Sequence, residues 1–339
     1  EADFMHIDER IRQITEIFSY FRNPDKETVL TPWRVVNMHM SDTIGGWCWY
    51  DESFDEKTGV LDTPRYVDQG DVTRQLFDNV DLAGEVQTKI LEINSKTGLY
   101  PLYVTYSLFR RRLDEYIKAE CIDKEMVSVQ EEQVVWDDIV KDNMYVICNT
   151  PMAVGITRRT LFGFRQVDQK ANIKNVQLIE RASKNQEELV QELKSVGFWK
   201  GNTSKQEMKF NAVVGNPPYQ LSGHGQKPLP IYQNFIDLAR TLKPKCISIV
   251  SPSRWFAAND LKEFRDSIIK ENKLDIIHDF ADARLCFPNV EIKGGISYFR
   301  WNDDSNQYCN FFIHNDKGVT QTMRNLSTEN TEILIRDGY

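Results

Sequence analysis

The chain has 339 residues, 41% of them hydrophobic, which is enough for one large α/β domain with insertions or appendages. Its formal net charge of −8 argues against a protein that grips duplex DNA through a basic face of its own. The sequence has no run of 18 apolar residues, which argues against a membrane-spanning helix. Six scattered cysteines, without a CxxC pair or metal-ligand spacing, favour a reducing cytoplasm and no metal site.

Predicted helices and strands alternate along the chain. Helical spacing predicts a helix over residues 7–21, and Thr31-Pro32 predicts the start of another, with Thr31 as its N-cap. Short apolar runs predict seven strands, with helices between most of them, at residues 89–93, 144–148, 176–179, 212–214, 246–250, 274–277 and 295–301. This alternation predicts a doubly wound, mostly parallel α/β sheet covered on both faces.

Composition divides the chain into three parts. Residues 1–30 are predicted as an N-terminal helical segment, and residues 31–301 as the α/β domain. An insertion at about 41–88 is rich in Gly, Asp, Trp and Tyr. Residues 302–339 are polar, with a strand-like stretch at 308–314, and are predicted to lead toward a further domain.

The most informative residues are Asn216, Pro217, Pro218 and Tyr219, which follow the apolar run 210–215. Ligands of doubly wound sheets lie beyond the carboxyl ends of the strands, where this turn falls. The Asn216 side-chain oxygen and the Pro217 carbonyl are two acceptors whose directions the proline pair presets. Aimed at the two hydrogens of a flat NH2 group, they would free the nitrogen lone pair, and Tyr219 would stack on the ring. The pattern predicts catalysis on a group such as the amine of adenine.

Two further segments complete a resemblance. Residues 31–40 read Thr-Pro-Trp-Arg-Val-Val-Asn-Met-His-Met, and residues 91–98 read Leu-Glu-Ile-Asn-Ser-Lys-Thr-Gly. With the turn at 216–219, and in this order, they resemble the γ-class N6-adenine DNA methyltransferases of restriction–modification enzymes over roughly residues 29–301. The resemblance implies a Rossmann-like methyltransferase fold, S-adenosylmethionine as cofactor, and an adenine flipped out of double-stranded DNA.

The resemblance also implies roles for single residues. Thr31 and Pro32 would lie by the methionine end of the cofactor, Glu92 would hold its amino group, and the stretch Asn94 to Gly98 would bring backbone close to it. Lys96 stands where the family usually has Gly, and either crowds the cofactor or pairs with its carboxylate. Cys148 aligns with the family's ribose-binding acid, for which the neighbouring Asn149 would substitute. Glu180 would bind the cofactor's adenine edge.

The implied setting is a cytoplasmic restriction–modification enzyme. A target recognition domain, and nuclease or helicase parts of the same polypeptide, are the expected partners, with no membrane. Residues 220–230 would form a flap over the base pocket. The spacing of Asp282, Glu291 and Lys293 resembles a metal-dependent nuclease, but it falls on strands already assigned to this sheet.

Three alternatives remain beside this interpretation. Protein-glutamine methyltransferases use the same Asn-Pro-Pro-Tyr turn, although they usually lack the Thr-Pro segment. N4-cytosine methyltransferases typically have Ser or Asp in place of Asn216. A methyltransferase-like scaffold that binds DNA without catalysis is the third alternative, and Lys96 and Cys148 are the features that favour it.

Overall fold

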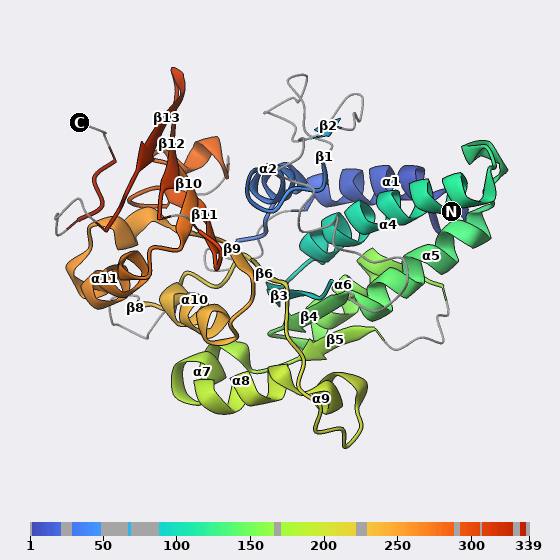
Figure 1. Cartoon of the computed structure of the whole chain (residues 1–339), viewed down its shortest axis with the longest axis horizontal. Helices are drawn as coiled ribbons and strands as arrows, with labels where there is room; N and C mark the ends of the chain where they lie inside the picture. Colours follow the sequence, from blue (N-terminus) through green and yellow to red (C-terminus); the bar gives the residue numbers. More distant parts are fainter. Residues whose placement is uncertain are drawn as a thin grey trace.

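The computed structural model describes residues 2–21, 29–48, 67–68, 88–165, 171–221, 229–287, 292–305, 307–327 and 333–336. Most of its strands form one nine-stranded sheet, in the order β13-β12-β10-β11-β9-β6-β3-β4-β5 (Figure 1). These strands are β3 (Ile90–Ser95), β4 (Met144–Cys148), β5 (Asn172–Asn175), β6 (Ala212–Gly215), β9 (Cys246–Pro252), β10 (Leu274–Phe280), β11 (Ile296–Asn302), β12 (Cys309–Asn315) and β13 (Gly318–Arg324).

Strand direction divides the sheet. Neighbours from β5 to β9 are all parallel, whereas β11 is antiparallel to both β9 and β10. The chain starts at β3, adds β4 and β5 on one side, and then crosses to β6 and β9 on the other. The strand order therefore reverses between β3 and β6, and their carboxyl ends form the switch point at which such sheets bind ligands.

Helices cover both faces of the sheet (Figure 1). One face packs against α1 (Ile7–Ser19), α2 (Trp33–Thr43), α4 (Leu99–Glu120), α5 (Val129–Asp142) and α6 (Pro151–Phe162). The other packs against α7 (Leu178–Lys184), α8 (Gln186–Lys194), α9 (Val196–Lys200), α10 (Tyr232–Thr241) and α11 (Lys262–Lys270). Alternation explains this burial: Ala212 and Val214 of β6 face the first layer, and Val213 faces the second.

Smaller elements complete the described part. Two short antiparallel pairs join β1 (Trp47–Cys48) to β2 (Val67–Asp68) and β7 (Gln220–Leu221) to β8 (Leu229–Pro230). Single turns of 3-10 helix are found at Ala2–Phe4, Lys124–Met126, Ser253–Phe256, Asn259–Leu261 and Ala283–Leu285. Among the described residues, no helix combines the length and apolar character needed to cross a bilayer.

The α/β fold with a mostly parallel sheet is confirmed, but the sheet has nine strands where seven were predicted. The additional strands are β12 and β13: β12 pairs in parallel with β10, so residues 309–324 continue the sheet. The third predicted strand, at 176–179, is wrong. Strand β5 ends at Asn175, and Leu178 begins helix α7. Val176 and Leu178 pack in the core where this helix begins. A short run with such buried apolar residues has the same sequence pattern as a buried strand, which explains the wrong prediction.

The predicted N-cap of the second helix is also wrong. Helix α2 begins at Trp33, its N-cap is Pro32, and no side chain caps it. The hydroxyl of Thr31 makes a different contact, which belongs to the site described next. Most of the predicted insertion and the centre of the predicted flap, residues 222–228, lie outside the described residues, as does Glu291 of the nuclease-like spacing.

Candidate active site

Strand β6 places the Asn-Pro-Pro-Tyr turn against the central strand β3. Gly215, the last residue of β6, pairs with Ile93 of β3 and has a φ of +149°. A Cβ atom at this position would lie 2.5 Å from the Ile93 carbonyl oxygen. Only glycine fits such a close approach in this conformation, and the glycine brings Asn216 beside the turn that follows β3.

The Asn216 side chain is held in one orientation. Its Nδ2 donates to Thr31 Oγ1 at 2.9 Å, and its backbone oxygen accepts from Asn94 Nδ2 at 3.1 Å. The residue is 3% exposed, and its Oδ1 has no hydrogen-bond partner among the described residues. A buried amide oxygen without a partner costs free energy, so this atom is a strong acceptor for a donor that enters the site.

The rest of the turn closes over Asn216. Pro217 is buried, and Pro218 and Tyr219 are half-buried. The Tyr219 ring packs against an apolar cluster that includes Val29 and Cys286. Burial raises the pKa of Tyr219 well above its ordinary value. Stacking of a flat group on this ring stays a prediction.

Glu92 is a buried carboxyl group beside this turn. It is 3% exposed, and its Oε2 has no hydrogen-bond partner in the described part of the chain. Burial raises the pKa of Glu92 to about 8, while the Ser95 hydroxyl and the Lys96 ammonium act in the opposite direction. A partly ionised, unsatisfied carboxyl group suits a ligand that brings its own positive charge.

Lys96 and Gly98 have structural contacts that their sequence positions did not reveal. Lys96 Nζ donates to the Val29 carbonyl at 2.9 Å and so ties the turn after β3 to the segment that leads to Thr31. Gly98 has a φ of +79°, and a Cβ there would lie 3.0 Å from the Thr157 Cα of helix α6. It therefore serves the start of α4 and a close helix contact.

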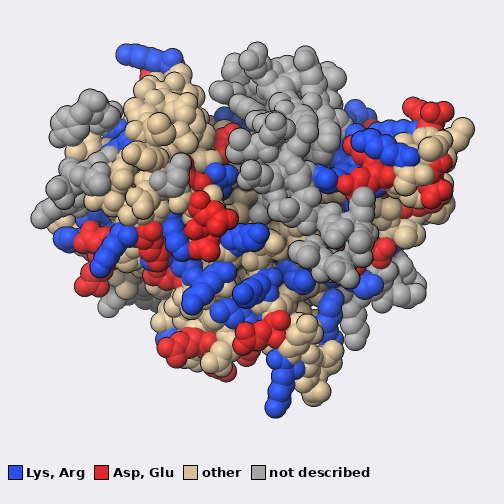
Figure 2. All heavy atoms as spheres, viewed as in Figure 1, with Lys and Arg blue, Asp and Glu red and all other residues tan. Residues whose placement is uncertain are grey.

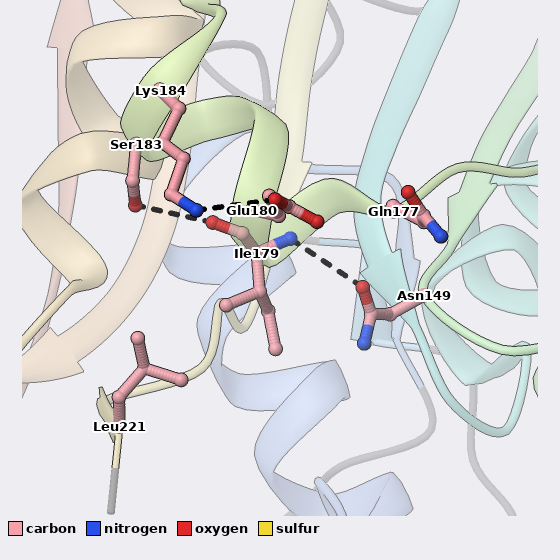
Figure 3. A pocket seen from close by; sticks show the side chains of 7 residues that line it. All are labelled: Asn149, Gln177, Ile179, Glu180, Ser183, Lys184 and Leu221. Carbon is pink, nitrogen blue, oxygen red and sulfur yellow. Dashed lines mark hydrogen bonds and ion pairs between the residues drawn. The ribbon is translucent and has the colours of Figure 1, made fainter. Parts of the chain in front are cut away.

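A second group of predicted residues lines a cavity of about 390 Å³ near the ends of β4 and β5 (Figure 3). Asn149 follows β4, and Glu180 lies in the first turn of α7, where it pairs with Lys184 at 3.2 Å. Asn149 Oδ1 accepts from the backbone N–H groups of Leu178 and Ile179, at 3.1 and 3.4 Å. The other lining residues are Gln177, Ile179, Ser183, Lys184 and Leu221.

This cavity lies close to the Asn-Pro-Pro-Tyr turn in sequence, because Leu221 is two residues after Tyr219. Cys148 does not line it: its thiol is buried 3.8 Å from Thr157 Oγ1, and burial raises its pKa to about 12. Asn149 uses its oxygen to cap helix α7, so only its NH2 group remains for a ligand. The structure thus unites Thr31, Asn94 and Asn216 by direct hydrogen bonds, and places Asn149 and Glu180 around a separate cavity.

Two residues beside the site were not predicted from the sequence. Tyr100 is buried next to Thr31 and Glu92, and His39 bonds to its hydroxyl at 2.9 Å. His39 lies on the buried face of α2, where a histidine looks like an ordinary core residue. For Tyr100, the only sequence feature that indicated a place beside the site was its position two residues after Gly98, at the start of a predicted helix.

Parts of the chain are similar to known proteins. Residues 142–287, which include the Asn-Pro-Pro-Tyr turn, match a family described as Eco57I restriction-modification methylase. A relative from Mycoplasma pneumoniae, named "Uncharacterized adenine-specific methylase", is 41% identical over 105 residues, or 29% of this chain and 24% of the relative. The chain thus matches about a quarter of that relative's length.

Two solved structures share the fold. The ATP-dependent Type ISP restriction-modification enzyme LlaBIII bound to DNA has a TM-score of 0.50 at 10% identity, covering 91% of this chain and 21% of that one. A nuclease-deletion mutant of the Type ISP enzyme LlaGI, in complex with a DNA substrate mimic, has a TM-score of 0.50 at 14% identity, covering 86% and 24%.

A second family description, the Tudor-knot or RNA binding activity-knot of a chromodomain, matches residues 83–124. The described part of that stretch forms the central strand β3 and helix α4 of the large sheet, so it is not a separate binding module. The first match and the methylase relative point the same way: residues 142–287 resemble the Eco57I restriction-modification methylases.

Proposed function

We propose that this chain is the methyltransferase core of a restriction–modification enzyme and transfers a methyl group from S-adenosylmethionine to N6 of an adenine in DNA. The observation that carries the proposal is the buried Asn216 Oδ1, which is oriented by Thr31 and lacks a partner. An exocyclic NH2 group is the donor that fits this acceptor beside the Pro217 carbonyl.

The residues beside the turn fit the proposed cofactor. The unsatisfied Oε2 of Glu92 suits the cofactor's ammonium group. The cavity bounded by Asn149 and Glu180 would take its nucleoside end, at the carboxyl edge of β4 where doubly wound sheets bind nucleotides. When bound, the cofactor supplies an electrophilic methyl group on a sulfonium.

The chain's own residues would activate the amine. Asn216 Oδ1 and the Pro217 carbonyl accept the two N6 hydrogens, which favours a pyramidal nitrogen with a free lone pair. Both acceptors are held before the base arrives, so little reorganisation is needed during the reaction. After methyl transfer the nitrogen is positively charged, and the same two oxygens stabilise that charge until the nitrogen gives one proton to water. The Tyr219 ring moves off the turn to admit the flipped base.

We propose that double-stranded DNA is held mainly by other parts of a cytoplasmic enzyme, with a target recognition domain as the main one and nuclease or helicase parts as further partners. The face shown in Figure 2 carries basic and acidic side chains intermixed, and the formal net charge of the chain is −8. Strong binding to phosphates needs a basic surface, so we expect this chain alone to bind DNA weakly.

The test is methyl transfer from radiolabelled S-adenosylmethionine to DNA by the full-length enzyme, followed by nucleoside analysis. We expect label in N6-methyladenosine, and a loss of about 10²- to 10³-fold or more in Asn216→Ala with cofactor binding nearly unchanged. Label in N4-methylcytosine, or in protein glutamine and not in DNA, would assign the turn to another substrate. No transfer, with folded protein and no heat of cofactor binding, would identify a scaffold.

A further inference from the structure

The Asn216 amide has two possible orientations, and they have opposite chemistry. In the observed orientation Nδ2 faces Thr31 and Oδ1 is left as an acceptor. Rotated by 180°, the amide would turn its NH2 group toward the substrate amine, and two donors would face each other. Catalysis as proposed therefore depends on whatever keeps Nδ2 on the side of Thr31.

Thr31 alone does not decide the orientation, because a hydroxyl group both donates and accepts. It accepts from Asn216 reliably only if its own hydrogen is directed elsewhere. The Tyr100 phenol lies beside it and can receive that hydrogen. Burial raises the pKa of Tyr100 well above its ordinary value, so the phenol keeps its proton. The Tyr100 hydroxyl donates a hydrogen bond to His39 Nδ1 at 2.9 Å. Its oxygen can then accept a hydrogen bond from Thr31.

His39 continues the chain of hydrogen bonds in one direction. Burial lowers the pKa of His39 to about 3, so the ring is neutral and has one donor and one acceptor nitrogen. With Nδ1 accepting from Tyr100, Nε2 carries the hydrogen and donates to Ser248 Oγ at 2.7 Å. Ser248 then donates to Thr43 Oγ1 at 2.5 Å, and Thr43 donates to the His39 carbonyl at 2.6 Å.

The carbonyl at the end of this chain sets its direction. A backbone carbonyl only accepts, so each hydroxyl group in turn must donate toward it. Starting from the His39 carbonyl, this rule assigns the donor in turn to Thr43, Ser248, His39, Tyr100 and Thr31. The last hydroxyl group is then left as an acceptor, and Asn216 must present its NH2 group to it.

We infer that Thr31 donates to Tyr100 and so extends the hydrogen-bond network of Tyr100, His39, Ser248 and Thr43 to Asn216. This network fixes the orientation of the Asn216 amide, and its members are positioning residues for catalysis. The inference rests on the proposed function for its catalytic meaning, because the substrate amine is what Oδ1 receives. The network joins α2, α4 and β9 to the catalytic turn, and so links two helices of the first layer to one amide.

Tyr100→Phe is the informative variant, because it removes one oxygen from the network and leaves the side chains of Thr31, Glu92 and the Asn-Pro-Pro-Tyr turn unaltered. The matched control is Tyr103→Phe, a buried tyrosine of the same helix whose hydroxyl donates to the Gly45 carbonyl at 2.9 Å, outside the chain. In the full-length enzyme we expect Tyr100→Phe to lower kcat about tenfold, with KM values for cofactor and DNA within about twofold of wild type. Tyr103→Phe should leave kcat unchanged.

A second pair of variants addresses Thr31 itself. Thr31→Val keeps the shape and removes the acceptor, and we expect kcat to fall about tenfold or more. Thr31→Ser keeps the hydroxyl group and should restore most of kcat. Wild-type kcat in Tyr100→Phe, or equal losses in Thr31→Ser and Thr31→Val, would overturn the inference, because the hydroxyl groups would then have no orienting role.

An NMR measurement separates this inference from the proposed function. In protein labelled with 15N-asparagine, the Asn216 NH2 signals are identified by their absence in Asn216→Ala. We expect Thr31→Val and Tyr100→Phe to speed their exchange with water by about tenfold or more, and Tyr103→Phe to leave it unchanged. If these exchange rates change as expected but the wild-type enzyme methylates no DNA, the proposed function is wrong and the hydrogen-bond network is supported. If the exchange rate is unchanged in both Thr31→Val and Tyr100→Phe, the hydrogen-bond network does not orient Asn216, whatever the methylation activity.

Discussion

The buried carboxyl group of Glu92 predicts a steep pH dependence of S-adenosylmethionine binding. Burial raises its pKa to about 8, from an ordinary 4.5. At pH 7 only about a tenth of the molecules then carry the carboxylate. Since the cofactor's ammonium group binds the ionised form, each pH unit below 8 should weaken binding about tenfold, or about 1.4 kcal/mol. Binding of the cofactor's ammonium group should therefore release the proton from the Glu92 carboxyl group.

The ligand limits the affinity on the alkaline side. An α-amino group has a pKa of about 7.7 to 8.0, so above pH 8 the cofactor loses the charge that Glu92 would bind. The affinity should rise about tenfold from pH 6 to pH 7, rise less to a maximum near pH 8, and then fall. At pH 7 binding should release about 0.9 proton from Glu92.

Isothermal titration calorimetry at pH 6, 7 and 8, in buffers of different ionisation heat, measures both affinity and proton release. Glu92→Gln should flatten the acidic side, since a neutral amide does not titrate. 5′-Methylthioadenosine, which lacks the amino-acid end, should bind wild type with little pH dependence. The reasoning is refuted if wild type binds the cofactor equally well at pH 6 and pH 7, or if Glu92→Gln keeps the same slope.

Three further changes test other contacts of the site. Gly215→Ala should lower the free energy of unfolding in urea by about 2–4 kcal/mol, because its Cβ meets a carbonyl of β3, while Gly155→Ala, with nothing within 4 Å, should not destabilise. Lys96→Met should move the rise of cofactor affinity between pH 6 and 8 to higher pH, since the Lys96 ammonium group lowers the pKa of Glu92. An unchanged pH dependence would contradict this. Asn149→Ala should cost about 1 kcal/mol of stability as a lost helix cap and raise the cofactor KM, and a normal KM would remove the residue from the site.

Local patterns predicted those parts of the structure that depend on neighbours in sequence. Residues 212–215 form the expected buried strand, and the glycine and prolines around Asn216 form the expected turn at its carboxyl end. Strand β5 was missed because it reads Asn-Ile-Lys-Asn at a sheet edge, while the more apolar residues after it begin a helix. Edge strands bury little, so their apolar signal is weak.

The polar contacts behind the site could not be predicted in this way. His39 and Ser248 are 209 positions apart, and nothing in either segment indicates the other. Their pairing exists because helix α2 packs on the sheet across β9. A histidine among apolar helix residues gives the same sequence signal whether it is a lone core residue or one member of a chain of hydrogen bonds. Only the tertiary fold separates the two cases.

Thr31 shows why a failed local prediction can locate a functional contact. A threonine before a proline at a helix start is expected to cap the helix, and losing such a cap costs about 1 kcal/mol. Here helix α2 has no side-chain cap, and the hydroxyl group accepts from the Asn216 amide at 2.9 Å. Natural proteins accept the loss of a local contact of this kind mainly at functional sites. An Asp at this position would place a second carboxyl group near Glu92. The two tasks exclude each other, and the structure shows which one this residue performs.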